Sequence, residues 1–343
     1  MLVTIKYSTF EMRYTFSFKL INMFNIKKVF LASLFLIPTI HYSQHTDEIN
    51  SNRPGESMSA FAVGKTVIQV ETGVFGITEE HSLLKYNANG FGMDLKVRYG
   101  AFLEELEFIA EAQYVYETFN YPLNTVDKSD FRQTVLGAKY LIYDPNKGYK
   151  KEVNLHSWKA NHKFNWHQVI PAVAVYGGVN YTGENNPYFL TSTPEASFST
   201  ISPKAALILQ NHLGDGSWVF VTNIIYNYIA TDYPSLSYIL TLTKGINDKW
   251  SAFVENQGIK SDFYSDAIVR GGAAYLINKN LQVDASISGN FKDTPSVLYG
   301  GVGVSWRYDG RYKEVRLLTK EEEAAEKMSK KSKTKNQFKA PKK

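Results

Sequence analysis

Strict alternation of apolar and polar residues is the feature that most restricts what this chain can fold into. Residues 91–99, FGMDLKVRY, place Phe, Met, Leu, Val and Tyr on one side and Gly, Asp, Lys and Arg on the other. A period of two indicates a β-strand with two unlike faces. Residues 105–117, ELEFIAEAQYVYE, repeat the pattern with charges again on one face. Such strands are longer than those of most soluble sheets, and they match the roughly 9–11 residues that cross a membrane at a tilt.

The same alternation recurs between residues 66 and 308. It predicts twelve strands, near residues 66–76, 86–99, 103–118, 131–143, 166–181, 201–212, 217–230, 235–245, 249–259, 265–277, 280–290 and 296–308. An even number of antiparallel strands is typical of bacterial outer-membrane barrels. The predicted fold class is therefore all-β, an antiparallel up-and-down transmembrane β-barrel over 66–308. A soluble β-sandwich also alternates, but its polar face meets bulk water and does not need strands this long.

Connector lengths predict which way the barrel faces. The connectors after the second, sixth, eighth and tenth strands are short, whereas 119–130 and 182–200 are long. Outer-membrane barrels have short periplasmic turns and longer outer loops, so we expect both termini of the chain on the periplasmic side of a Gram-negative outer membrane. Residues 144–165 break this order. They either form a periplasmic insertion or conceal a missed pair of strands.

The N-terminal region carries an export signal. Residues 23–43 combine two lysines with a short apolar run and a polar exit, which predicts a signal peptide. Met23 is then the expected start, and residues 1–22 form an upstream extension that is not native. Residues 44–65 are expected to be a periplasmic segment. No later apolar run is long enough to form a transmembrane helix.

Charge and its distribution exclude a nucleic-acid groove. The chain has a net charge of +5, but residues 1–43 contribute +4 and 309–343 contribute +6, which leaves −5 for the middle. A mildly acidic middle lacks the basic patch that binds nucleic acid. The hydrophilic, Lys-rich tail at 309–343 is expected to be disordered. It either stays solvated or contacts anionic lipid head groups or the cell wall.

Motifs for catalysis, metals and cofactors are missing from the sequence. The chain has no cysteine, which excludes disulfides and thiolate sites. No HExxH spacing, GxSxG elbow or phosphate-binding loop occurs. We therefore expect no metal, no cofactor and no enzymatic activity.

Several short stretches, in order, resemble one known family. They are SNRPGES, GKTVIQVETG, LGAKYLIYDP, KWSAFVENQG, GGAAYLINKNLQVDASISGNF and GGVGVSWRY, and together they cover about residues 52–308. The chain resembles the outer-membrane proteins named for the meta-pathway of phenol degradation, a family often labelled "transporter". The resemblance implies an outer-membrane β-barrel that passes small hydrophobic or aromatic compounds. Asn52 stands where the family often has an aspartate before Arg-Pro.

The RPGES stretch, with Arg53, Pro54, Gly55 and Glu56, directly precedes the first strand. Proline fixes its own backbone and glycine permits a turn, so the chain is able to fold sharply at the periplasmic rim. Arg53 and Glu56 then either reach inward to pair with charges in the lumen or belong to a simple linker.

Charged residues on the inward face form a second candidate site. The predicted cluster is Asp94, Lys96, Arg98, Glu105, Glu107 and Glu111, and Lys139, Glu255, Gln282, Asp284 and Arg307 are expected in the same lumen. Opposite charges on paired strands attract, and a charged interior must be paired or wet. The cluster is either a structural plug of salt bridges, the favoured interpretation, or the lining of a selective pore.

The expected function is passive passage of small hydrophobic or aromatic molecules, with outer-membrane lipid and the permeant as partners and no cofactor. A structural barrel without transport is the alternative. Glycines in the last strands either leave room for an apolar guest or merely let the sheet curve. They are Gly271, Gly272, Gly301 and Gly303.

Overall fold

Twelve antiparallel strands form the structured part of the protein. The computed structural model describes residues 49–149, 165–181 and 201–310, apart from 215, 233 and 263. The predicted extension 1–22, the signal peptide 23–43 and the tail from residue 311 onward lie outside the described residues. Within the described ranges, no helix is both long and apolar enough to cross a membrane.

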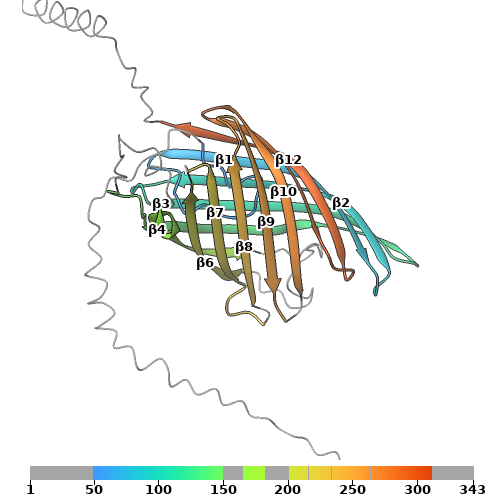
Figure 1. Cartoon of the computed structure of the whole chain (residues 1–343). Helices are drawn as coiled ribbons and strands as arrows, with labels where there is room; N and C mark the ends of the chain where they lie inside the picture. The colour runs from blue at the N-terminus through green and yellow to red at the C-terminus, as the bar shows by residue number, and fades with distance from the viewer. Residues whose placement is uncertain are drawn as a thin grey trace, which may run out of the picture. The chain divides into compact units, whose positions relative to one another are not determined.

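The strands follow one another around a closed barrel (Figure 1). They are β1 (Val67–His81), β2 (Tyr86–Gly100), β3 (Leu106–Asn120), β4 (Thr125–Tyr143), β5 (Ala172–Tyr181), β6 (Ile201–Leu213), β7 (Trp218–Asn227), β8 (Ser235–Gly245), β9 (Trp250–Lys260), β10 (Ser265–Asn278), β11 (Leu281–Asn290) and β12 (Ser296–Asp309). Each pairs with its neighbours in sequence, and β1 pairs with β12 from Val67↔Asp309 onward. The predicted fold class of a twelve-stranded antiparallel barrel is confirmed.

Three predicted strand boundaries were wrong by five residues or more. The first strand, predicted to end at residue 76, extends to His81. The expected long connector at 119–130 is strand for most of its length, because β3 ends at Asn120 and β4 begins at Thr125. Both faces of this hairpin are polar in the DKSD stretch, so the alternation that reveals a strand is absent there. The strand predicted from residue 166 starts only at Ala172, after a short 3-10 helix, η2 (Trp166–Val169), capped by Asn165.

No strand of the described barrel wall lies between β4 and β5, the two strands that flank the long segment at 144–165. β4 pairs directly with β5, from Tyr143↔Val173 to Thr134↔Tyr181. The alternative of a missed strand pair is therefore excluded between these two strands, and residues 150–164 lie outside the described part of the chain.

The wall has an apolar outer face and a polar inner face, the reverse of a soluble protein. Outward side chains include Phe91 and Leu136, which are 54% and 66% exposed. Inward side chains include Glu71, Arg98 and Glu107, which are fully buried. Exposed apolar residues around a whole barrel are typical of walls that contact lipid.

Residues 49–65 lie inside the barrel, and we call them the lumen segment. It enters at the end of the barrel where β1 begins, because Ile49 N–H donates to the carbonyl of Lys279 in the β10–β11 turn, at 2.9 Å. It leaves at the same end, where Thr66 N–H donates to the carbonyl of Gly100 at 2.8 Å. Met58 and Ala60 are buried among wall residues. The sequence predicts a turn at the rim, whereas the structure places the Arg-Pro-Gly turn within the lumen.

Candidate functional site

A row of four paired residues crosses the seam where the barrel closes. Asp94 on β2 pairs with Gly73 on β1, Gly73 pairs with Gly303 on β12, and Gly303 pairs with Asp284 on β11. Paired residues point to the same face of a sheet, so two glycines form a floor between two carboxylates. The row is a cradle for one flat cation.

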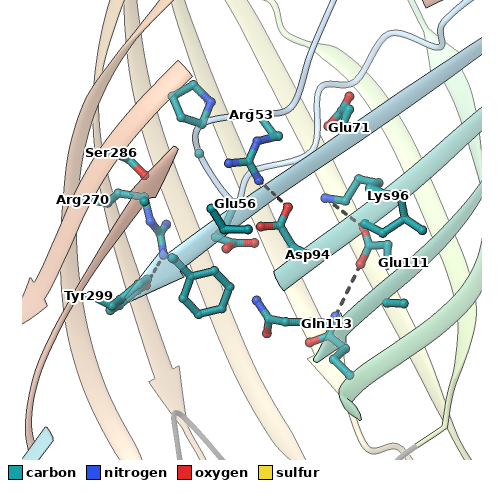
Figure 2. Close-up of a pocket in the computed structure, with 18 of the residues that line it drawn as sticks. Arg53, Glu56, Glu71, Asp94, Lys96, Glu111, Gln113, Arg270, Ser286 and Tyr299 are labelled. Atoms are coloured by element: carbon teal, nitrogen blue, oxygen red, sulfur yellow. Dashed lines mark hydrogen bonds and ion pairs between the residues drawn. The ribbon is translucent and has the colours of Figure 1, made fainter. Parts of the chain in front are cut away.

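Arg53 of the lumen segment occupies this cradle, and Figure 2 shows its ion pair with Asp94. Its Nη1 pairs with Asp94 Oδ2, and its Nη2 lies 3.2 Å from Asp284 Oδ1. Burial acts to lower the pKa of Arg53, but the two carboxylates outweigh this effect and raise the pKa above its ordinary value. A guanidinium held on both sides ties the lumen segment to both strands that flank the closing seam.

The glycine floor is needed for this contact, which gives the first testable prediction. A methyl group added at Gly73 would overlap the guanidinium of Arg53, whereas one added at Gly76, on the same strand, meets nothing within 4 Å. Gly73→Ala is expected to lower the free energy of unfolding by about 1–3 kcal/mol, as overpacking does. Gly76→Ala is the matched control and should be neutral or slightly stabilising. Equal effects in denaturant titrations would contradict the cradle.

A second, fully buried network lies four residues further along β2 from Asp94, nearer the end of the barrel at which the lumen segment enters. Arg98 donates through Nε and Nη2 to Glu107, at 2.8 and 3.0 Å, and its Nη1 lies 3.2 Å from Glu71 Oε1. Lys139 Nζ lies 3.3 Å from Glu107 Oε1. Charges this deep are tolerated only when they are paired and hydrogen-bonded. Two cations and two carboxylates therefore balance one another inside the wall.

The wall also satisfies the backbone of the lumen segment. Asn223 Oδ1 accepts from Met58 N–H at 2.6 Å, and its Nδ2 donates to the Met58 carbonyl at 3.0 Å. Gln210 Oε1 accepts from Ala60 N–H, and Lys139 Nζ donates to the carbonyl of Ser59 at 2.7 Å. An irregular buried segment has no regular backbone hydrogen bonds of its own, so side chains from distant strands supply partners for its N–H and C=O groups. The lumen segment is therefore built into the barrel.

Other predicted site residues have varied surroundings. Lys96 pairs with Glu111 at 3.0 Å across β2 and β3, and Glu105 pairs with Lys147 at 3.1 Å beside the β4 end. Gln282 Nε2 donates to the carbonyl of Arg53 at 3.2 Å.

The remaining predicted residues are placed as follows. Glu255 accepts from the backbone of Glu56 and Ser57 and pairs with Arg270, while Arg307 lies 3.9 Å from Asp309. Pro54 and Gly55 line the cavities beside Arg53. The described part of the chain holds no cluster of acidic or histidine side chains suited to a metal ion.

Sequence analysis missed Glu71, Gln210, Asn223 and Arg270 as partners. Each lies at an inward position of an alternating strand, which is the one signal that marks them. Nothing local indicates that their partner is a segment before the first strand.

Cavities flank the lumen segment on two sides. One of about 860 Å³ is lined by its residues together with Asp144 and Lys279, at the end where the segment enters. Two smaller cavities, of about 100 and 120 Å³, lie further along the strands, and Glu56 and Tyr299 line both of them. The lumen segment therefore divides the interior into an entrance cavity and a smaller, charged chamber.

Solved barrels of several kinds resemble this fold at low identity. An outer membrane channel from Pseudomonas putida F1 has a TM-score of 0.44 and 10% identity, over 76% of this chain and 100% of that chain. The translocator domain of the autotransporter NalP from Neisseria meningitidis has a TM-score of 0.42 and 9% identity, over 71% and 89%. The TodX deltaS2S3 mutant, a monoaromatic hydrocarbon channel, has a TM-score of 0.38 and 10% identity, over 71% and 90%. Values this low support no conclusion about function.

Sequence comparison gives a clearer result. No curated protein is significantly similar to the chain. One family model matches residues 51–308, which is most of the chain and nearly all of the barrel and its lumen segment. The chain belongs to the family described as "Putative MetA-pathway of phenol degradation".

Proposed function

We propose that the protein is an outer-membrane channel for passive passage of small hydrophobic or aromatic molecules, with both termini of the chain on the periplasmic side. The observation that carries the proposal is the entrance cavity of about 860 Å³ within a closed wall whose outer face is apolar. Family membership supports the substrate class, because the family is described by phenol degradation.

The lining of the entrance cavity offers one apolar patch to such a guest, formed by Phe61, Val219, Val221 and Phe253. Most of the other lining residues are polar, and Arg53, Asp144 and Lys279 are charged. Binding sites for small organic molecules combine apolar surface with polar groups that fix the orientation of the guest. We infer that transport needs no catalytic step and no cofactor.

A structural barrel without transport is the alternative, and one observation favours it. The lumen segment is held by side chains of at least eight strands, among them Glu71, Arg98, Glu107, Lys139 and Asn223. A segment anchored this widely closes the direct path along the axis unless it moves.

Uptake in a deletion strain separates the two functions. At limiting concentrations of toluene or benzyl alcohol, cells without the gene are expected to accumulate the compound more slowly, and the restored gene should recover the rate. The protein should be found in the outer-membrane fraction. Unchanged uptake across both compounds, with no conductance from purified protein in planar bilayers, would favour the structural barrel.

A further inference from the structure

Lys204 on β6 is a lumen cation that makes no direct ion pair within the described residues, although Glu111 and Glu56 attract it over a longer distance. It is 9% exposed, follows the inward alternation of its strand and lines the cavity of about 120 Å³. Its ammonium lies 6.0 Å from the ring centre of Tyr176, and within the described residues it has no hydrogen bond or ion pair. A buried ammonium without a directly bonded anion is costly, so a further anion in contact with it would stabilise the site.

Most other cations of the lumen have an anion. Ion pairs join Arg53 to Asp94 and Asp284, Lys96 to Glu111, Arg98 to Glu71 and Glu107, Lys139 to Glu107, and Arg270 to Glu255. The unpaired state of Lys204 is therefore a local feature rather than a general property of the interior.

Glu56 is the competing carboxylate inside the charged chamber. It lies at the tip of the lumen segment and lines both small cavities. In the view of Figure 2, Glu56 lies near the centre, with Tyr299 to its left and Lys96 to its right. Only its backbone N–H is hydrogen-bonded, to Glu255. Its side chain is exposed to the chamber and makes no ion pair with Lys204 among the described residues.

Tyr299 gives the same chamber an aromatic surface, and the guanidinium carbon of Arg270 lies over its ring, 5.5 Å from the ring centre. Tyr299 lines both small cavities and packs edge-on against Phe75, with ring centres 6.5 Å apart. The cavities of about 100 and 120 Å³ share several lining residues, and each approaches the roughly 150 Å³ that holds benzene in a protein core. Tyr299 and Lys204 both line the cavity of about 120 Å³, so an aromatic ring and its anionic group would each have a partner in the same cavity.

We propose that the charged chamber binds the carboxylate of a small aromatic acid, with Lys204 as its counter-ion. This inference rests on the proposed function, since it names the class of molecule that passes the chamber. Binding is non-covalent: the carboxylate replaces water at the ammonium and competes with Glu56.

The test is titration calorimetry of the full purified protein in detergent, with benzoate and with neutral benzyl alcohol. Wild type is expected to bind benzoate at least about tenfold more tightly, the discrimination that one charge-assisted contact gives. Lys204→Met should abolish this preference, and Lys204→Arg should keep it. Lys249→Met, in the exposed β8–β9 turn, is the matched control and should behave as wild type.

A second variant acts in the opposite direction. Glu56→Gln removes the competing carboxylate and is expected to tighten benzoate binding, so the inference stays testable even if Lys204→Met does not fold. Equal affinity of wild type for the two compounds, or a preference that survives in Lys204→Met, would overturn it. Uptake of benzyl alcohol in cells judges the proposed function separately. Benzoate binding without uptake supports the site and refutes passage, whereas uptake without benzoate preference refutes the site alone.

Discussion

Replacing Arg53 with methionine is expected to lower the free energy of unfolding by about 3 kcal/mol, the lower end of the cost of breaking a buried ion pair. The side chains of Arg53 and Asp94 retain 15% and 26% exposure, which argues for the lower end. Without the guanidinium, Asp94 and Asp284 face each other across the glycine floor with no cation between them. Denaturant titration in detergent measures the loss.

The same variant should also open the lumen. Arg53 links the tip of the lumen segment to the closing seam, so its removal is expected to raise single-channel conductance in planar bilayers. The control is the triple variant Arg53→Met, Asp94→Asn, Asp284→Asn, in which no unpaired carboxylates remain. It should regain most of the stability while conductance stays high. A single variant as stable and as closed as wild type would show that the cradle does not anchor the segment.

The barrel was predictable because its signal is local. A strand with lipid on one side and polar groups on the other repeats every two residues, as Met93, Leu95 and Val97 do opposite Asp94 and Lys96. The signal fails where both faces are polar, which is why the β3–β4 hairpin is longer than predicted. Strand ends that extend beyond the lipid-facing apolar surface have polar residues on both faces, so their sequence does not alternate.

The path of the lumen segment was not predictable, because its determinants are distant in sequence. Residues 49–65 have no periodicity, and their partners Asn223 and Glu255 lie on β7 and β9. Alternation places such side chains on the inner face but does not say what they contact. The inward glycines Gly73 and Gly303 were a usable clue, since adjacent glycines on paired strands leave room for a large side chain.

Pairing within the charged cluster depends on strand register, which alternation leaves open. The β2–β3 turn sets Lys96 opposite Glu111 and Arg98 opposite Ile109. Arg98 therefore reaches Glu71 and Glu107 on the two flanking strands rather than the residue it faces. One residue more in the turn would change every partner.

Arg98 distinguishes a structural network from the lining of a pore. Its side chain is fully buried and also donates to the carbonyl of Asn50 at 2.7 Å, so it holds both the wall and the lumen segment. Arg98→Met is expected to cost about 3–5 kcal/mol of unfolding free energy, because Glu71 and Glu107 lose their main cation. Arg98→Glu adds a third buried carboxylate and should prevent folding, since whole domains have only about 5–15 kcal/mol of stability.

Lys96→Met provides the matched comparison on the same strand. Its pair with Glu111 is partly exposed, at 17% and 14%, so the expected loss is about 1.5–3 kcal/mol, the range for a hydrogen bond to a charged group. If Arg98 is structural, Arg98→Met lowers stability more than Lys96→Met and leaves the preference for cations over anions in planar bilayers unchanged. A stable Arg98→Met protein with altered ion preference would instead place Arg98 in the wall of an open pore. The hydrogen bond between Arg98 and the carbonyl of Asn50 would then have to be broken in the conducting state.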